Sequence, residues 1–328
     1  MSVKWSEEAP EIIKDYLRYL SVVKGKSENT VNEYYLDLRT FFRYIKKLRG
    51  LVNDDVAFND ISVSDVTLDL VSSVTLDDAY KYMYFLKTER NNSSTTRSRK
   101  ASSLSSYFKY LTNKKMYLSV NPIQELESPK HGKRLPKYLS LEQCFDLLNA
   151  VDGPYKERDY CILVLFLNCG MRLSELCSIN YNSISDGKLS IIGKGNKERK
   201  IYLNKACLDA INNYMAVRPV DGVKDKYALF ISRQNKRISP KSVQAMVNKY
   251  LDKIGLGGQG YSVHKLRHTA ATLMYQHGGV DVRILKEILG HENLGTTEIY
   301  THLSDNQLQD AVNSNPLANV EKKKDNEH

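Results

Sequence analysis

A basic stretch near the middle of the chain, PKHGKRLPK at residues 129–137, most strongly limits what this sequence can fold into. Its two prolines and its glycine predict an extended linker. At 328 residues, the chain is also longer than one typical domain. We therefore expect an N-terminal domain at 1–128, this linker, a second domain at 138–303, and a C-terminal helix with a polar tail at 304–328.

The N-terminal domain is predicted to be entirely helical. Apolar residues recur at helical spacing in four segments, at residues 9–22, 29–48, 76–89 and 94–111. In the third of these segments, four apolar side chains are expected to face inward: Tyr80, Met83, Tyr84 and Leu86.

The net charge of +10 is concentrated in one part of the chain. Residues 81–140 contain thirteen Lys or Arg and three Glu, whereas residues 51–80 contain seven Asp and no Lys or Arg. A polyanion is expected to bind the first segment, and the second is expected to face away from it. The alternative is an ordinary solvated basic surface. The candidate contacts lie early in the helix at 94–111 and in the linker: Arg97, Arg99, Lys100, Lys133, Arg134 and Lys137.

The second domain is predicted to combine helices with a small sheet. Helices are expected at 141–151, at 155–169, from Arg172 onward, and at 240–254. Short alternating segments predict strands at 188–192, 199–203 and 228–232. The sequence GKGNKE joins the first two strands, so the tip of their hairpin presents Lys194 between two glycines.

Residues 264–300 carry the most informative chemistry. His264 and Arg267 are three residues apart, so on a helix they project from one face and can bind one anion, such as a phosphate. This helix is expected to end at Gly278-Gly279, and a second apolar pattern ends at Gly290.

His291 follows Gly290 directly, and a new helix beginning near Thr296 or Thr297 is expected to carry Tyr300. On one continuous helix His291 and Tyr300 would face opposite sides. The break between the two helices allows their side chains to meet.

Five motifs now stand in order: GMRLSEL around Arg172, GKGNKER around Lys194, HKLRHT from His264, LGH ending at His291, and TTEIYTH around Tyr300. Together they resemble the signature of the tyrosine recombinases, the integrase family that includes the Xer proteins. The resemblance covers the second domain fully and the N-terminal domain loosely. It implies a mainly α fold, in which an all-helical, SAM-like core-binding domain and an α+β catalytic domain with a small β-sheet form a C-shaped clamp on DNA.

The resemblance assigns the nucleophile to Tyr300, which would form a covalent 3′-phosphotyrosine. It places five further catalytic residues around it and gives Glu175 a supporting role: Arg172, Lys194, His264, Arg267 and His291. A guanidinium is always charged and can bind two phosphate oxygens, so the two arginines suit the charge of the transition state. The histidines can donate hydrogen bonds to the phosphate.

Two of these residues suit proton transfer. His264 can accept the proton of the tyrosine, whose free phenol titrates only near pH ~10. Lys194, with its pKa lowered by nearby arginines, can protonate the leaving 5′ oxygen. Taken alone, Lys194 is an ordinary turn residue, and Arg172 could simply pair with Glu175. Three neighbouring basic residues are interpreted as phosphate contacts or solvated side chains: Lys197, Arg199 and Lys200.

No cofactor or metal is expected, because a phosphotyrosine conserves the energy of the broken bond for rejoining. The sequence has no Walker-type G-x-x-x-x-G-K-[ST] motif and no carboxylate set that predicts a two-metal nuclease. The five cysteines form no C-x-x-C pair and are interpreted as reduced, mostly buried thiols. The absence of a long apolar run or a signal-peptide pattern favours a cytoplasmic, nucleoid-associated protein of bacterial type.

The resemblance implies site-specific recombination of double-stranded DNA. Four protomers on two paired sites, identical or with a related recombinase, would exchange strands through a Holliday junction. An accessory DNA-binding or regulatory protein could take part, and the tail after Leu303 would dock into a neighbouring protomer. Dimer resolution of chromosomes or plasmids, mobile-element integration or excision, and inversion stay open. The absence of an evident arm-binding domain before Lys4 favours the first.

Two other functions stay open at this point. A type IB topoisomerase shares the covalent chemistry but relaxes supercoils as a monomer. A non-catalytic DNA-binding protein could share the fold, although a complete set of motif residues speaks against it.

Overall fold

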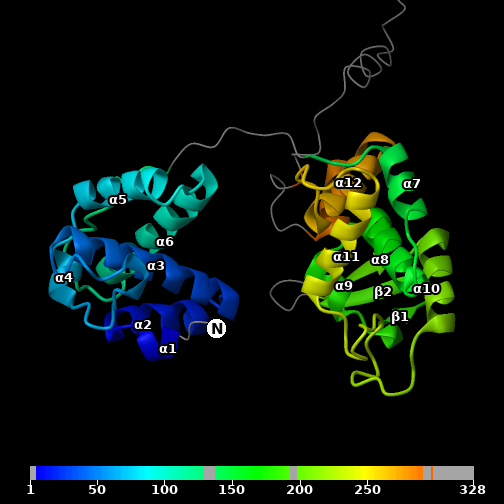
Figure 1. The fold of residues 1–328 in the computed structure, drawn as a ribbon, viewed down its shortest axis with the longest axis horizontal. Helices are drawn as coiled ribbons and strands as arrows, with labels where there is room; N and C mark the ends of the chain where they lie inside the picture. The colour runs from blue at the N-terminus through cyan, green and yellow to red at the C-terminus, as the bar shows by residue number, and fades with distance from the viewer. Residues whose placement is uncertain (1–4, 129–136, 193–197, 291–296, 298–328) are drawn as a thin grey trace, which may run out of the picture. The chain divides into compact units, whose positions relative to one another are not determined.

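The computed structural model describes residues 5–128, 137–192, 198–290 and Thr297. It divides into two compact units, Met1–Lys133 and Arg134–His328, and the boundary falls within the residues predicted to be the linker (Figure 1). No helix in the described part of the chain is long and apolar enough to cross a membrane.

The described residues of the N-terminal unit form helices joined by loops, with no strand (Figure 1). Its helices are α1 (Trp5–Glu8), α2 (Glu11–Arg18), the π-helical turn η1 (Tyr19–Val23), α3 (Glu28–Leu48), the 3₁₀ turn η2 (Phe58–Asp60), α4 (Leu68–Ser72), α5 (Leu76–Thr88) and α6 (Ser94–Asn113). The four predicted helices are confirmed. Residues 52–74, for which no element was predicted, contain η2 and α4.

Local chemistry explains where these helices begin. Ser27 caps α3 by accepting the backbone N–H of Thr30, and Ser93 caps α6 in the same way. Thr75 and Asp78 form a reciprocal capping box at the start of α5. Large aromatic side chains fill the core between the helices, among them Tyr16, Tyr35, Phe41, Phe42, Tyr82, Tyr107 and Phe108.

One predicted helix face is partly wrong. Tyr80 and Tyr84 of α5 are 45% and 69% exposed, whereas Met83 and Leu86 are buried as predicted. The buried side of α5 is centred on Tyr82 and Phe85, and the ring of Tyr82 packs edge-on against that of Phe41. Tyrosine occurs on both sides of this helix, so the apolar pattern alone does not identify the inward side.

The core of the C-terminal unit contains a mostly buried helix, α8 (Lys156–Cys169), which contacts α7 (Leu141–Asn149), α10 (Lys205–Val217) and α12 (Val263–Gln276) (Figure 1). The remaining helices are α9 (Leu173–Ser178), the 3₁₀ turn η3 (Tyr181–Ser183), α11 (Pro240–Lys253) and α13 (Val282–Leu289). Helix α10 was not predicted from the sequence.

The described sheet has three antiparallel strands in the order β1-β2-β3. These are β1 (Ile184–Ser185), β2 (Lys188–Ile192) and β3 (Glu198–Tyr202). Leu189 pairs with Ile184 on one side and with Ile201 on the other. The predicted hairpin is confirmed, but the third strand is β1 and not residues 228–232.

Residues 228–232 make single bridges instead, between Asn180 and Ala228 and between Ile231 and Arg237. The buried guanidinium of Arg218 donates hydrogen bonds to the carbonyls of Ala228 and Leu229. A side chain thus satisfies backbone groups that a neighbouring strand would otherwise satisfy.

Candidate active site

The end of α8 places Arg172 at the start of α9. Gly170 ends α8 in the left-handed conformation (φ +57°), and a Cβ there would lie 2.8 Å from the side chain of Leu289. Glycine is therefore required for both the backbone angle and the close contact. Arg172 follows two residues later as the N-cap of α9, and its backbone N–H donates to Glu175 at 2.7 Å.

Glu175 joins two arginines through its buried carboxylate. Arg172 Nη1 donates to Oε1 and Arg199 Nη2 donates to Oε2, each at 2.8 Å. Burial opposes ionisation of this carboxyl, but the backbone N–H of Arg172 and the charge of Arg199 outweigh it and lower the pKa of Glu175. The carboxylate is therefore ionised and holds both guanidinium groups.

Three arginines converge on the C-terminus of α13, and we call Arg172, Arg199 and Arg267 the arginine cluster. Arg199 Nη1 donates to the carbonyl of Ile288, Arg267 Nη2 to that of Leu289 at 2.7 Å, and Arg172 Nη2 to that of Gly290 at 2.9 Å. Helix C-termini leave such carbonyls without intrahelical partners and carry partial negative charge. The cluster therefore stabilises the helix end that immediately precedes His291.

Arg267 and His264 reach the site from α12, as their spacing predicts. Arg267 is 3% exposed and also donates to the carbonyl of Gly170 at 2.7 Å. His264 lies at the exposed edge of the site, with its ring edge-on to that of His268 at 4.6 Å. Partial burial, followed by the charges of Arg267, Lys265 and Arg172, lowers the pKa of His264.

The structure thus brings together four of the predicted catalytic and supporting residues: Arg172, Glu175, His264 and Arg267. The side chain of Arg172 is 34% exposed, so a ligand can reach it while Glu175 and Gly290 hold it. Six others lie outside the described residues: Lys133, Arg134, Lys194, Lys197, His291 and Tyr300. Within the described part of the chain, no group of three or more metal-binding side chains is found.

Two of the basic residues predicted to contact a polyanion lie inward instead. Lys100 is 9% exposed, and its ammonium donates to the buried carboxylate of Asp37 at 3.0 Å. Arg199 belongs to the arginine cluster, and its side chain is 15% exposed. These placements correct the prediction that both are accessible. Each side chain points toward a buried acidic partner that sequence spacing does not reveal.

The other described basic candidates are at least partly accessible. Arg99 is exposed although it also pairs with Asp37, and Arg97 is half-buried on the same helix. Lys200 is exposed on β3. Lys137 is exposed, donates to the carbonyl of Gln259 at 2.6 Å, and lies over the ring of Tyr261.

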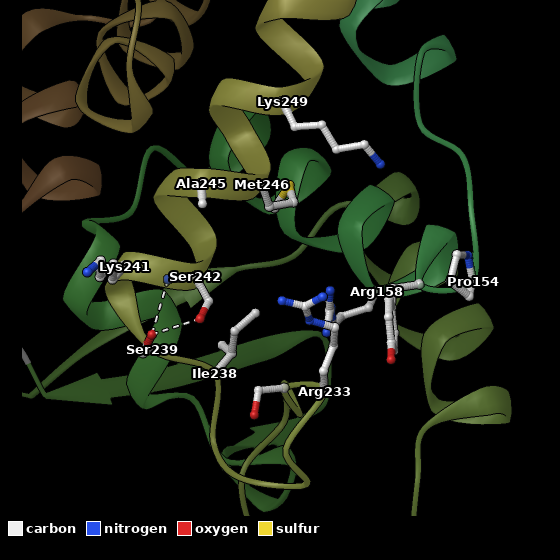
Figure 2. Close-up of a pocket in the computed structure, with 12 residues that line it drawn as sticks. Pro154, Arg158, Arg233, Ile238, Ser239, Lys241, Ser242, Ala245, Met246 and Lys249 are labelled. Carbon is white, nitrogen blue, oxygen red and sulfur yellow. Dashed lines mark hydrogen bonds between the residues drawn. The ribbon is translucent and has the colours of Figure 1, made fainter.

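A basic cavity of about 600 Å³ beside the start of α11 was not predicted from the sequence (Figure 2). Arg158, Arg233, Lys241 and Lys249 contribute to its lining. Arg158 is already held there by Asp159 and by the carbonyl of Ile231. None of the predicted site residues lines this cavity, so it is separate from the arginine cluster.

Comparison with known proteins identifies the family of both units. Residues 137–307 match the phage integrase family, and residues 13–115 match the N-terminal SAM-like domain of phage integrases. Tyrosine recombinase XerC of Caldanaerobacter subterraneus subsp. tengcongensis is 55% identical over 94% of this chain and 88% of that protein. Tyrosine recombinase XerD of Proteus mirabilis is 31% identical over 92% of each chain.

Solved structures show the same fold. The XerH site-specific recombinase bound to its difH substrate, in a pre-cleavage complex, has a TM-score of 0.65 at 21% identity, covering 92% of this chain and 83% of that one. A lambda integrase (75–356) dimer bound to a COC′ core site has a TM-score of 0.64 at 16% identity, covering 87% and 96%. This chain belongs to the phage integrase family, the tyrosine-type site-specific recombinases.

Proposed function

We propose that this chain cuts and rejoins duplex DNA at paired sites through a covalent 3′-phosphotyrosine on Tyr300. The observation that carries the proposal is the arginine cluster at the end of α13. Two of its members, Arg172 and Arg267, are the arginines that the family motifs assign to the scissile phosphate. Because Arg172 is anchored and still accessible, it can bind a phosphate without first losing much side-chain entropy.

The remaining roles follow from chemistry at the same site. His264 has a lowered pKa, so it is neutral near pH 7 and able to accept the tyrosine proton. His291 donates a hydrogen bond to the phosphate, and Lys194 protonates the leaving 5′ oxygen. The two units form a clamp on the duplex. Seven basic side chains contact the phosphate backbone of the DNA: Arg97, Arg99, Lys133, Arg134, Lys137, Lys197 and Lys200.

The biological role we propose is resolution of chromosome or plasmid dimers in the bacterial cytoplasm, at the nucleoid. The 55% identity to a protein named tyrosine recombinase XerC, over most of both chains, supports this role over mobile-element integration or inversion. Four protomers, identical or paired with a related recombinase, exchange strands through a Holliday junction. An accessory DNA-binding protein can regulate the exchange.

The test is denaturing capture of the protein from its host cells, followed by sequencing of the attached DNA. Wild type is compared with Tyr300→Phe and with the control Tyr84→Phe, which changes an exposed tyrosine of α5. We expect covalent DNA from wild type and the control and none from Tyr300→Phe. The recovered sequences distinguish a chromosomal resolution site from the end of a mobile element or an invertible segment. Equal amounts of covalent DNA from all three proteins would show that a residue other than Tyr300 is the nucleophile.

Assembly on DNA is tested separately with the recovered site. Light scattering on complexes with one and two sites is expected to give two and four protomers. Truncation after Ser304 is expected to weaken the four-protomer complex, because we assign the tail to contacts between protomers. Relaxation of supercoiled DNA by a monomer, without pairing of sites, would instead support topoisomerase activity.

A further inference from the structure

Arg199 differs from its neighbours on β3 in the direction of its side chain. Glu198 and Lys200 are exposed, whereas the side chain of Arg199 is 15% exposed. Alternate residues of a strand point to opposite faces. Arg199 therefore projects into the C-terminal unit, while Lys200 projects outward.

The side chain of Arg199 connects β3 to two other segments. Its Nη2 donates to Glu175 Oε2 of α9, and its Nη1 donates to the carbonyl of Ile288 in α13. Gly290 lies directly against it, because a Cβ on Gly290 would be 3.0 Å from Arg199 Cδ. Any side chain at residue 290 would therefore displace the side chain of Arg199.

Both connections lead to Arg172. The carboxylate of Glu175 offers one oxygen to Arg199 and the other to Arg172. The end of α13 offers the carbonyl of Ile288 to Arg199 and that of Gly290 to Arg172. Removal of the Arg199 guanidinium would free Glu175 to turn toward Arg172 and would leave the last turn of α13 without one of its caps.

We propose that Arg199 is a positioning residue of the recombinase, which sets the orientation of Arg172 and of the backbone leading to His291. This inference rests on the proposed function. This role replaces the phosphate contact that the sequence suggested for Arg199, and it connects β3 to the phosphate-binding Arg172 through the carboxylate of Glu175. A shift of about 1 Å in a catalytic group can reduce a rate by roughly 10²-fold.

The test compares Arg199→Met and Arg199→Lys with the matched control Lys200→Met. Methionine removes the charge and keeps the length of the stem, and Lys200 is the exposed neighbour on the same strand. Duplex DNA carrying the captured site is used to measure Kd over a series of salt concentrations. A nicked form of that duplex, which traps the covalent product, is used to measure single-turnover cleavage at saturating protein.

We expect Arg199→Met to bind DNA within about threefold of Lys200→Met and to cleave roughly 100-fold more slowly than wild type. Arg199→Lys, which keeps the charge but cannot donate in a fork, should recover part of the rate. A weaker affinity with a salt slope reduced by about one, together with unchanged cleavage at saturation, would overturn the proposal, because that pattern marks a phosphate contact.

Urea unfolding of each variant separates misplacement from misfolding. If Arg199→Met does not fold, Arg199→Lys decides: slower cleavage at unchanged Kd supports positioning, and wild-type cleavage overturns it. Wild-type protein that forms no covalent product would contradict the proposed function itself. That failure is distinct from a loss confined to the Arg199 variants.

Discussion

Each unit of this recombinase contains a buried carboxylate that holds basic side chains, and the two differ in where their contacts lead. Asp37, 1% exposed, accepts hydrogen bonds from Arg99, Lys100 and Ser103. All three donors lie on α6, so this network ties α3 to α6 and ends there. Glu175, 3% exposed, accepts from Arg172 and Arg199.

The hydrogen bonds around Glu175 extend to a further helix, α13, whereas those around Asp37 join only α3 and α6. The arginines bound to Glu175 go on to donate to carbonyls at the end of α13, and Arg172 keeps a third of its side chain exposed. Asp37 holds one enclosed cation, Lys100, and one exposed cation, Arg99, but both lie on α6. The same chemical device therefore joins two helices in one unit, and in the other it also connects an exposed cation to the helix end that precedes His291.

The largest effect should follow Asp37→Asn. This change leaves the charge of Lys100 buried without its anion, and breaking a buried ion pair in this way costs about 3 kcal/mol. Urea unfolding followed by a probe in the N-terminal unit measures the loss. Asp77→Asn, which removes an exposed partner of Lys81, serves as the control and should change little.

A double variant sharpens this test. Adding Lys100→Met to Asp37→Asn removes the orphaned charge and should restore most of the lost stability. If the double variant is less stable than Asp37→Asn, the ammonium does not depend on this carboxylate.

The next largest effect on folding, and the largest on chemistry, should follow Glu175→Gln. The amide keeps the shape of the side chain but removes the charge that holds Arg172 and Arg199. We expect about 2 kcal/mol of stability to be lost, because hydrogen bonds to charged groups are strong, and single-turnover cleavage to fall roughly 100-fold. Folded Asp37→Asn protein should cleave normally at saturation. Equal cleavage by the two variants would remove the distinction between the networks.

Gly290→Ala should have a smaller effect on stability. Gly290 ends α13 with φ +63°, where a side chain costs about 1 kcal/mol, and its Cβ would press on Arg199. The melting temperature and the rate of cleavage should both fall. Gly153→Ala is the control for backbone strain alone, since Gly153 also has a positive φ but open space around its Cβ.

The smallest expected effect is a histidine-dependent loss of stability in mild acid. It is confined to the C-terminal unit, because residues 1–128 contain no histidine. The pKa of His264 is lowered by folding, so the unfolded chain takes up its proton first as the pH falls below about 6.5. Wild type should therefore lose stability relative to His264→Gln between pH 7.5 and 5.5, by an amount that solvent screening keeps small. Parallel urea midpoints for the two proteins would show that His264 is not responsible.

Much of the fold could be predicted because it depends on local chemistry. Apolar spacing and capping residues identified α3, α6 and α11, and glycines marked where α8 and α13 end. The same reasoning placed His264 and Arg267 on one helix. It failed for α5, where tyrosines on both sides obscured the buried face, and for residues 228–232, where Arg218 replaces a strand.

The sequence by itself determined the order of the helices, the breaks around the site, and the motif residues that identify the family. Only the tertiary structure decided which basic side chains are available to DNA. Asp37 lies 62 residues from Arg99, and Glu175 lies 24 residues from Arg199. Local sequence patterns do not predict such pairs. Each pair forms only because tertiary packing brings the carboxylate and the cation together and removes water from around them.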